Sequence, residues 1–377
     1  MKILHFYKTA LPATVGGVQQ VIHDLAAGAA KAGHDVQVLT LGDSNRHDDV
    51  GGYHVSQCRS DFEFASSPVS APALAAFRRL AAEADIVHYH YPWPFMDLSH
   101  FAARIACPSV VTYHSDIVRQ KIAGKLYAPL RELFLNSVSS IVATSPNYAA
   151  TSPVLQRHSS KVSVIPLGIN DDDAPAPAEK IAYWRERLGG PFFLFVGVLR
   201  YYKGLHILLD AAAGTDLPIA IVGAGPIEGE LRAQADALKL KNVHFLGRLS
   251  NEDKAALLGL SLATVFPSHL RAEAFGISLL EGAMHGKPLI SSEIGTGTSY
   301  VNVDGVTGLV VPPNNPAALL SAMLQMWSDP QLARQMGQRA RQRFEALFTA
   351  DRMVAGYLAL YENLRAGRKS ERLIASF

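Results

Sequence analysis

Residues 265–286 read VFPSHLRAEAFGISLLEGAMHG and place two glutamates around the expected start of a helix. The apolar beginning predicts the end of a buried strand, Gly276 the start of a helix and Gly286 its end. Glu273 therefore precedes the helix, and Glu281 lies about a turn and a half inside it. A helix N-terminus carries unpaired N–H groups and a partial positive charge, which suit a phosphate better than a carboxylate. The pattern favours a ligand that brings its own anion and offers hydroxyls to both glutamates, although two surface acids near a helix start would look the same.

Short apolar strands and amphipathic helices alternate through the second half of the chain. Strands are expected at 192–197, 219–222, 243–246, 263–266, 289–292 and 308–311. Helices are expected at 204–213, 226–238, 251–259 and 276–285, then at 316–327, 330–348 and 350–364. Such alternation predicts a parallel sheet covered on both faces.

The first half of the chain shows the same alternation. Strands are expected at 3–6, 36–41, 85–90, 109–114, 140–144 and 161–166, with helices at 18–32 and 70–84. Residues 168–180 combine three consecutive acids with alternating alanine and proline and read as a linker. We predict an α/β protein of two doubly wound, Rossmann-like domains that face each other across a cleft. Residues 1–168 form the first domain and 169–350 the second, and we expect the last helix, about 351–377, to return to the first.

Length and composition fit this organisation. The 377 residues are 49% hydrophobic and 18% charged, as in an ordinary globular protein of about two domains. No apolar run approaches the roughly 20 residues of a membrane span, and the chain leads from Met1 directly into a strand, so we expect a cytoplasmic protein. A net charge of +2 is too small to indicate nucleic-acid binding.

Ligands of such sheets bind beyond the carboxyl ends of the strands, where several candidates fall. Arg200 and Lys203 follow the strand 192–197 and supply two cations at a helix start, as a diphosphate leaving group requires, although basic pairs in loops are more often solvated. Gly16 and Gly17 begin the first helix, where missing side chains let backbone amides approach a phosphate. His114 ends a strand of the first domain and is expected to point into the cleft, in a structural or a functional role.

Other patterns suggest different chemistry. Residues 171–173 are three aspartates that could bind a metal, but their place in the linker favours a solvated acid run. His88 and His90 share a strand face and could hold zinc with His114, although ordinary cleft histidines also explain them. Residues 223–228 are similar to a dinucleotide fingerprint, but Glu228 stands where the third glycine belongs, which makes an NAD-dependent dehydrogenase the weaker alternative. A periplasmic sugar-binding protein would need an export signal.

Taken together, these residues resemble the retaining glycosyltransferases of the GT-B fold, in the large family 4 group that includes bacterial mannosyltransferases of lipopolysaccharide and O-antigen assembly. Glu273 to Glu281 matches the E-x7-E motif of that family. Arg200 with Lys203 and the Gly16-Gly17 pair occur in the family's order, so the resemblance covers nearly the whole chain.

The resemblance implies a role for each of these residues. Glu281 would bind the ribose of the nucleotide, Glu273 the donor sugar near its C3 hydroxyl, and His114 the C6 region of that sugar. Arg200 and Lys203 would stabilise the diphosphate. The other implied donor-binding residues are Phe275, Gly276, Ile277 and Ser278 through their backbone amides, Gly247 and Arg248 near the base, and Gly16 and Gly17. After the strand 289–292 the sequence lacks the family's Gly-Gly turn and acid, so no contact is assigned there.

The resemblance also implies the reaction. We expect transfer of a hexose, with mannose from GDP-mannose as the first choice and UDP-linked sugars as the second. Arg200, Lys203 and the helix start at Gly276 meet the charge of the departing diphosphate without a metal or cofactor. Front-face attack with stereochemical retention is expected, because no carboxylate is evident where a covalent nucleophile would belong. A nucleotide-sugar epimerase on the same fold is the alternative.

The acceptor is expected to be a lipid-linked saccharide. Residues 117–131 contain four basic residues, no acid and apolar residues at helical spacing. A basic amphipathic segment suits an anionic membrane surface, at roughly 1 kcal/mol per basic residue near the lipid, although the solvated flank of a core helix would show the same pattern. We therefore expect peripheral association with the inner face of the cytoplasmic membrane.

Overall fold

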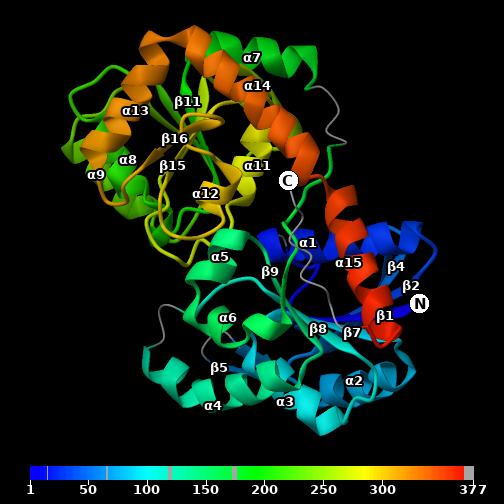
Figure 1. Ribbon diagram of the computed structural model, residues 1–377. Coiled ribbons are helices and arrows are strands. Elements are labelled where there is room, and N and C mark those ends of the chain that lie inside the picture. The colour runs from blue at the N-terminus through cyan, green and yellow to red at the C-terminus, as the bar shows by residue number, and fades with distance from the viewer. Residues whose placement is uncertain (15, 65–66, 118–120, 172–175, 369–377) are drawn as a thin grey trace. The chain divides into compact units, whose positions relative to one another are not determined.

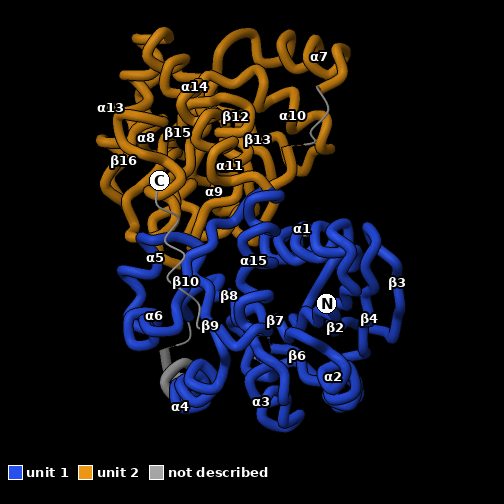
Figure 2. The backbone as a smooth tube through the Cα atoms, turned by 45° about the vertical axis from the view of Figure 1, so that its right-hand side comes forward, with its two compact units in different colours: residues 1–168, 350–377 blue, residues 169–349 orange. Residues whose placement is uncertain are grey.

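The computed structural model describes residues 1–14, 16–64, 67–117, 121–171 and 176–368, and the side chains of 121–125 are outside that description. The chain divides into two compact units (Figure 2). Unit 1 comprises residues 1–168 and 350–377, and unit 2 comprises residues 169–349. Each unit is built on its own sheet.

Unit 1 contains an eight-stranded sheet in the order β10-β9-β8-β7-β1-β2-β4-β3 (Figure 1). Its strands are β1 (Lys2–Phe6), β2 (Asp35–Gly42), β3 (Arg46–Val50), β4 (Tyr53–Arg59), β7 (Ile86–Tyr91), β8 (Ser109–Tyr113), β9 (Ser140–Ala143) and β10 (Val162–Val164). Every residue of β7 and β8 is buried, as expected of strands covered on both faces. The sheet order reverses between β1 and β7, because β1 leads outward to β2 and β7 leads outward to β8.

Helices cover both faces of the unit 1 sheet. Helices α1 (Gly17–Lys31) and α15 (Ala350–Arg365) lie against each other on one face, and α2 (Ala71–Glu83), α3 (Pro94–Ala103) and α4 (Lys121–Ser137) follow one another on the other (Figure 1). The smaller elements are β5 (Phe62–Phe64), β6 (Ser67–Val69), α5 (Pro146–Thr151), α6 (Pro153–Arg157) and η1 (Ser159–Lys161). Gly28 lets α15 approach α1 closely, since an added Cβ there would lie 2.5 Å from Val354 Cγ2.

Unit 2 contains a six-stranded, all-parallel sheet in the order β13-β12-β11-β14-β15-β16. Its strands are β11 (Phe193–Val196), β12 (Ile219–Val222), β13 (Val243–Gly247), β14 (Ala263–Phe266), β15 (Leu289–Ser292) and β16 (Gly308–Val311). Its helices are α7 (Ala178–Leu188), η2 (Tyr201–Lys203), α8 (Leu205–Ala212), α9 (Glu228–Ala237), α10 (Asn251–Leu260), α11 (Ile277–Met284), α12 (Thr298–Val301), α13 (Pro316–Ser328) and α14 (Pro330–Leu347). Helix α8 contacts α9 and α13, whereas α7 contacts α10 and α11 contacts α14, on the opposite face (Figure 1).

Three expectations from the sequence need correction. The unit 1 sheet is not wholly parallel, because β3 runs antiparallel to β4 at its edge. The expected linker 168–180 already contains the start of α7 at Ala178, and Ile169 forms a β-bridge with Thr349. Of the three aspartates expected to be solvated, Asp171 forms a two-point ion pair with Arg341, with 2.7 Å between Asp171 Oδ1 and Arg341 Nη1, and the other two lie outside the described residues.

Candidate functional site

The strand order of unit 2 reverses between β11 and β14, and this reversal brings two loops together. In an open parallel sheet, ligands bind at the carboxyl ends of the strands that flank such a reversal. β11 and β14 are hydrogen-bonded neighbours. The loop after β11 carries Arg200 and Lys203, and the loop after β14 carries Glu273. Site residues predicted from two separate parts of the sequence thus follow adjacent strands.

Lys203 and Glu273 form an ion pair at this point. Lys203 Nζ donates to Glu273 Oε2, and each side chain is only 11% exposed. Ser268 Oγ lies 3.4 Å from the same carboxylate oxygen, and Lys203 Nζ lies 4.5 Å from the ring centroid of Phe266. A charge withdrawn from water in this way needs a partner, so each residue fixes the position of the other.

Gly204 allows the two loops to interlock. It has φ +72°, and an added Cβ would lie 2.0 Å from the carbonyl oxygen of Pro267. Beside it, His269 N–H donates to Tyr202 C=O across 3.0 Å. The loop after β11 is therefore clamped against the loop after β14, which places the Lys203 ammonium beside the second loop.

The N-terminus of α11 is the next part of the site. Gly276 precedes the helix with φ +91°, a conformation that favours glycine, and no side chain caps the first turn. The N–H groups at such an end remain available to an anion. Phe275 is buried just before the helix, whereas Ile277 and Ser278 in its first turn are half-buried.

Glu281 and the remaining candidates of unit 2 lie around this centre. Glu281 Oε1 accepts from Lys254 Nζ across 2.7 Å, and both side chains are partly exposed. Gly247 ends β13 with φ +69°, and Arg248 after it is exposed. Arg200 is also exposed, and among the described residues no ion pair of Arg200 or Arg248 is found. Both guanidinium groups are thus open to an added anion.

The glycines that are similar to a dinucleotide fingerprint have a packing role. An added Cβ at Gly223 would lie 1.9 Å from the carbonyl oxygen of Gly197, and one at Gly225 would lie 2.2 Å from that of Leu199. Leu199 N–H also donates to Ala224 C=O across 3.1 Å. These glycines let the loop after β12 approach the loop after β11, so close packing accounts for them without a second nucleotide site.

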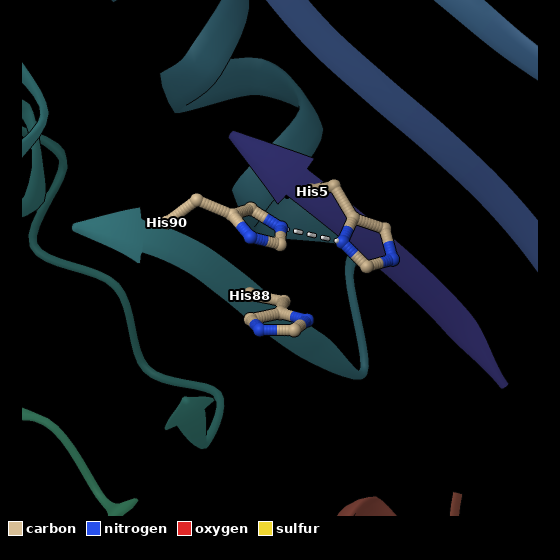
Figure 3. Close-up of side chains that lie close together, drawn as sticks. All are labelled: His5, His88 and His90. Atoms are coloured by element: carbon tan, nitrogen blue, oxygen red, sulfur yellow. Dashed lines mark hydrogen bonds between the residues drawn. The ribbon is translucent and has the colours of Figure 1, made fainter. Parts of the chain in front are cut away.

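Unit 1 places His114 at the carboxyl end of β8, in a column of buried histidines. His114 Nε2 lies 3.0 Å from His90 Nδ1, and His90 Nε2 lies 3.1 Å from His5 Nδ1. Figure 3 shows His5 and His90 joined in this way, with His88 beneath them. Burial lowers the pKa of both His5 and His114 to about 3 and holds the pKa of His90 well below its ordinary value. The column is therefore neutral at pH 7, and His88 and His90 are core residues rather than the cleft histidines expected from the sequence.

These histidines are also the described residues that come nearest to a metal-binding group. Candidate ligand nitrogens of His5, His88 and His90 lie within 4.8 Å of one another. However, His88 Nε2 contacts Thr112 Oγ1 at 2.7 Å and His88 Nδ1 contacts Tyr361 OH at 2.6 Å. The rings of His88 and His90 are stacked with centroids 4.3 Å apart, so their lone pairs run side by side instead of converging on one point. The geometry fits a hydrogen-bonded column better than a tetrahedral zinc site.

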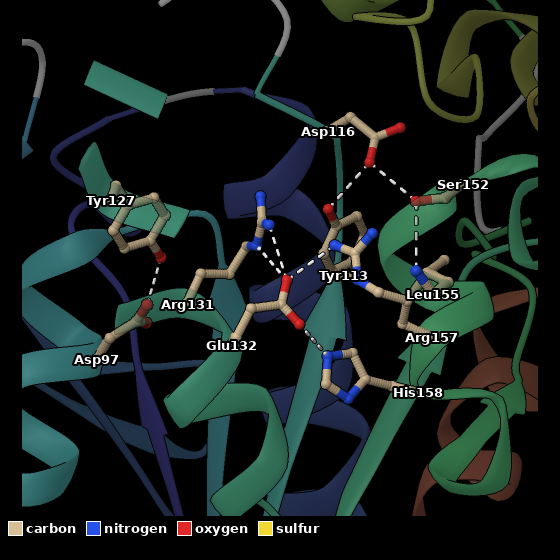
Figure 4. Close-up of polar contacts among 10 residues, drawn as sticks. All are labelled: Asp97, Tyr113, Asp116, Tyr127, Arg131, Glu132, Ser152, Leu155, Arg157 and His158. Atoms are coloured by element: carbon tan, nitrogen blue, oxygen red, sulfur yellow. Dashed lines mark hydrogen bonds and ion pairs between the residues drawn. The ribbon is translucent and has the colours of Figure 1, made fainter. Parts of the chain in front are cut away.

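A polar cluster surrounds the end of β8 near His114. Tyr113 OH and Ser152 Oγ both donate to Asp116 Oδ1 across 2.9 Å (Figure 4). A second group centres on Glu132, which accepts from Arg131, Arg157 and His158 (Figure 4). Burial alone would raise the pKa of Glu132, but the hydrogen bonds from the two arginines outweigh it and lower the pKa to about 2.

Gly16 and Gly17 open α1, after the strand β1 that flanks the reversal in the unit 1 sheet. Gly16 is the N-cap residue and has no side chain to occupy the first turn. An added Cβ at Gly16 would lie 2.5 Å from Gln19 Oε1, and Gln19 Nε2 in turn donates to Thr9 Oγ1 across 2.7 Å. The segment 117–131, expected to meet a membrane, lies partly outside the described residues.

Comparison with known proteins decides the family. Residues 178–343 match the family model "Glycosyl transferases group 1", and residues 15–173 match "Glycosyltransferase Family 4". The chain is 59% identical over 354 residues to D-rhamnosyltransferase WbpZ of Pseudomonas aeruginosa, covering 93% of each protein. The chain belongs to the family 4 glycosyltransferases.

This glycosyltransferase has further close relatives. It is 49% identical over 366 residues to O-antigen chain mannosyltransferase C of Escherichia coli, covering 97% of this chain and 99% of the relative. The sucrose-phosphate synthase of Thermosynechococcus elongatus superposes with a TM-score of 0.80 over 97% of this chain and 99% of that one, and at 22% identity it shows the shared fold. The GT-B fold and the family resemblance expected from the sequence are thus confirmed.

Several partners in the site of this glycosyltransferase were not predicted. Ser268 and Lys254 contact the two motif glutamates, yet no local pattern marks either residue, because the contacts join segments that only the tertiary structure brings together. A weak signal marked His5, because it is a histidine on an expected strand, as are His88 and His90, which are spaced two residues apart on one face of their strand. Within the described residues, no helix combines the length and apolar character that crossing a bilayer requires.

Proposed function

We propose that this glycosyltransferase moves mannose from GDP-mannose onto a growing lipid-linked saccharide of the O-antigen type, with retention of the anomeric configuration. The observation that carries the proposal is the Lys203–Glu273 pair beside the N-terminus of α11, at the strand-order reversal of unit 2. Cations and free N–H groups suit a diphosphate, and a carboxylate suits sugar hydroxyls. The mannose donor is supported by the Escherichia coli relative, whose name describes an O-antigen chain mannosyltransferase.

A second donor is supported by another relative. The protein that is 59% identical is named as a D-rhamnosyltransferase, and D-rhamnose is mannose without its C6 oxygen. Transfer of this 6-deoxy sugar is the second candidate function. The two donors differ only at C6, so residues that contact this position would distinguish them.

The proposed chemistry needs three events at the anomeric carbon. The bond from C1 to the diphosphate oxygen breaks, and the electron pair leaves with the diphosphate. The acceptor hydroxyl forms a new bond to C1 from the same face, and its proton passes to the departing phosphate oxygen. Arg200, Lys203 and the N–H groups that follow Gly276 stabilise the charge that develops on the diphosphate.

The other residues would hold the donor in place. Glu281 accepts from the ribose hydroxyls in exchange for its contact with Lys254, and Glu273 accepts from the sugar hydroxyl at C3. His114 contacts the C6 region of the sugar. The remaining proposed donor contacts are backbone amides of Phe275, Ile277 and Ser278, the Gly247-Arg248 segment near the base, and Gly16-Gly17 near the phosphates.

Donor use tests the proposal directly. The purified chain is incubated with a lipid-linked saccharide acceptor and GDP-mannose, GDP-D-rhamnose or UDP-glucose, and the anomeric configuration of the product is read by NMR. We expect an α-linked mannose from the α-linked GDP-mannose. An inverted linkage or a covalent glycosyl-enzyme would overturn the mechanism. Conversion of the nucleotide sugar without any acceptor would instead identify an epimerase.

A matched pair of arginine variants tests the diphosphate contact. Arg200→Ala should lower kcat by roughly 10²-fold, by analogy with the loss of one donor from an oxyanion site. Arg187→Ala removes an arginine from the surface of α7 in the same unit and should leave turnover unchanged. If Arg200→Ala raised only the KM for the donor, the proposed role in the departure of the diphosphate would be wrong.

We also propose that unit 1 docks on the anionic inner face of the cytoplasmic membrane. Large apolar side chains are exposed on three elements that lie on one side of this unit (Figure 1). They are Phe62 and Phe64 of β5, Leu98 and Phe101 of α3, and Leu126 and Leu133 of α4. Helix α3 contacts both α4 and β6, the strand that pairs with β5. An apolar group of this kind is unusual on a surface that meets only water.

Vesicle sedimentation tests this docking. The wild-type chain should sediment with phosphatidylglycerol vesicles at low salt, and the Phe62→Ser/Phe64→Ser variant should sediment less. Leu324→Ser provides the control, because Leu324 is an exposed leucine of α13 in unit 2. Failure of the wild-type chain to sediment would remove the membrane from the proposed function.

A further inference from the structure

Two hydrogen-bonded networks lie side by side in the core of unit 1. The first is the column that runs from His5 through His90 to His114. The second joins Tyr361, His88 and Thr112, and Thr112 Oγ1 continues to Tyr357 OH across 2.7 Å. The rings of His88 and His90 stack between the networks, but within the described residues no hydrogen bond links one network to the other. The protonation state of each network can therefore be argued separately.

The second network fixes His88. Tyr361 is buried, and its hydroxyl lies 2.6 Å from His88 Nδ1. A tyrosine hydroxyl in that position donates its proton, so His88 Nδ1 accepts. His88 then carries its own proton on Nε2 and donates it to Thr112 Oγ1. Both ring nitrogens of His88 thus have partners, Tyr361 of helix α15 and Thr112 of β8, and His88 takes no part in the column.

The direction of the column follows from its inner end. A neutral histidine has one N–H and one lone pair, so the protons of His5, His90 and His114 must all point the same way. Pointing inward, they would leave an N–H on His5 Nε2, which is buried and has no partner among the described residues. Pointing outward, they leave only a lone pair there. Buried N–H groups without an acceptor are the rarer of the two defects, so the outward direction is favoured.

We propose that His5 and His90 are positioning residues that hold His114 as its Nδ1–H tautomer, so that His114 offers the donor sugar a hydrogen-bond donor and no base. In this arrangement His5 Nδ1–H donates to His90 Nε2, and His90 Nδ1–H donates to His114 Nε2. The remaining proton of His114 lies on Nδ1, for which no partner is found among the described residues. The inference rests on the sugar contact assigned to His114 under the proposed function.

The tautomer determines which ligand atoms can form a hydrogen bond with His114. An N–H donor binds an oxygen lone pair, and the C6 hydroxyl of mannose supplies one where D-rhamnose has only a methyl group. A hydrogen bond to a missing oxygen cannot form, so the column also favours the mannose donor over its 6-deoxy form. Burial lowers the pKa of His114 to about 3, so the imidazole that donates this hydrogen bond is neutral near pH 7.

Nitrogen NMR of the full chain reads the tautomer without any turnover. In protein labelled with ¹⁵N-histidine, correlations between ring nitrogens and carbon-bound ring protons distinguish Nδ1–H from Nε2–H. We expect His5, His90 and His114 as Nδ1–H tautomers and His88 as the Nε2–H tautomer at pH 7.5. A wild-type His114 that carries its proton on Nε2 would overturn the proposal.

Variants of His90 distinguish the effect of its hydrogen bond on the His114 tautomer from the effect of side-chain packing. His90→Leu removes the donor to His114, and the His114 signals should change from one tautomer to an exchanging pair. His90→Asn places an amide N–H near the former Nδ1 and should restore the single Nδ1–H tautomer. Tyr361→Phe is the matched control, because it removes a buried hydroxyl from His88 only and should leave His114 unchanged. Unchanged His114 signals in His90→Leu would also overturn the proposal.

Kinetics then test the contact on which the inference rests. His90→Leu should lower kcat/KM for GDP-mannose by about three- to tenfold, the size of one neutral hydrogen bond, and His90→Asn should recover it. The same variants should change kcat/KM for GDP-D-rhamnose little. If the NMR result holds and kcat/KM for GDP-mannose is unaffected, the tautomer column is supported and the sugar contact of His114 in the proposed function is wrong.

Discussion

The ammonium of Lys203 and the carboxylate of Glu273 are in contact, and each side chain is only 11% exposed. Removing the charge of one residue therefore leaves the charge of the other buried without a partner. Lys203→Met and Glu273→Met should each lower the unfolding free energy of unit 2 by about 3 kcal/mol, because removing one partner leaves an unpaired buried charge. The double variant should cost less than the sum. Urea-dependent hydrogen exchange of the β11 and β14 amides measures all three.

Turnover is the second quantity to measure for the same single and double variants of Lys203 and Glu273. Both single variants should lose activity by roughly 10²-fold if the pair serves the departing diphosphate and the sugar. Additive stability losses in the double variant would mean that the two charges do not stabilise each other in solution.

At this scale the sequence predicted the two glutamates and the glycine between them, because strand, loop and helix signals are local. Lys203 was also predicted as a site residue, but its ion pair with Glu273 and the ion pair of Lys254 with Glu281 were not predicted. Lys203 lies 70 residues before Glu273, and Lys254 lies 27 residues before Glu281. Such pairs are selected by the order of strands in the sheet, which the residues of the motif do not encode.

Two glycines with nearly the same backbone conformation let the clamp between loops be tested at the scale of an element. Gly204 has φ +72° and Gly189 has φ +70°, so an alanine at either position carries similar backbone strain of about 1–2 kcal/mol. Only at Gly204 would the new Cβ meet a carbonyl oxygen, that of Pro267 at 2.0 Å, whereas nothing lies within 4 Å at Gly189. Gly204→Ala should therefore destabilise unit 2 by several kcal/mol more than Gly189→Ala.

Thermal unfolding of the two alanine variants, with binding of GDP measured alongside, checks this expectation. Gly189→Ala should bind GDP as the wild-type chain does, and Gly204→Ala should bind it weakly because Lys203 is displaced. Equal stability losses in the two variants would show that the interlocked loops contribute little.

The elements themselves were largely predictable, and the exceptions have physical reasons. Expected strands such as 219–222 and 263–266 agree with β12 and β14 at both ends, since buried parallel strands are continuous apolar runs. The hairpin of β3 and β4 was missed because the segment is polar. Its two-residue Gly51-Gly52 turn, with φ +57° and +86°, was a readable signal of a tight hairpin.

At the scale of the whole molecule, unit 1 is completed by a helix that follows unit 2 in the sequence. Helix α15 buries Tyr357 and Tyr361, whose hydroxyls reach Thr112 and His88. A chain that ends at Thr349 should therefore lose the folded state of unit 1, because it exposes an apolar sheet face and leaves buried polar groups without partners. Unit 2 should retain its fold.

Hydrogen exchange resolved to single amides measures this difference. Protection of β7 and β8 should disappear in the truncated chain, while protection of β11 and β14 persists. A chain that ends at Gly367 keeps the whole of α15 and is the control. Retained protection of β7 in the chain that ends at Thr349 would mean that unit 1 folds without its last helix.

The buried histidines also make the stability of unit 1 depend on pH. Burial lowers the pKa of His5 and His114 to about 3, whereas an unfolded histidine titrates near 6.5. Between those values the unfolded chain binds more protons than the folded one, so stability rises with pH and falls as the solution is acidified below about 6.5. Each such histidine should lower the free energy of unfolding by about 1.4 kcal/mol for each pH unit in this window.

Urea unfolding at pH 7, 6 and 5, followed by exchange of the β7 amides, should show this loss of stability. The substitution His5→Asn should reduce the slope of stability against pH by one histidine's share. An unchanged slope in His5→Asn would mean that the column does not control the acid response.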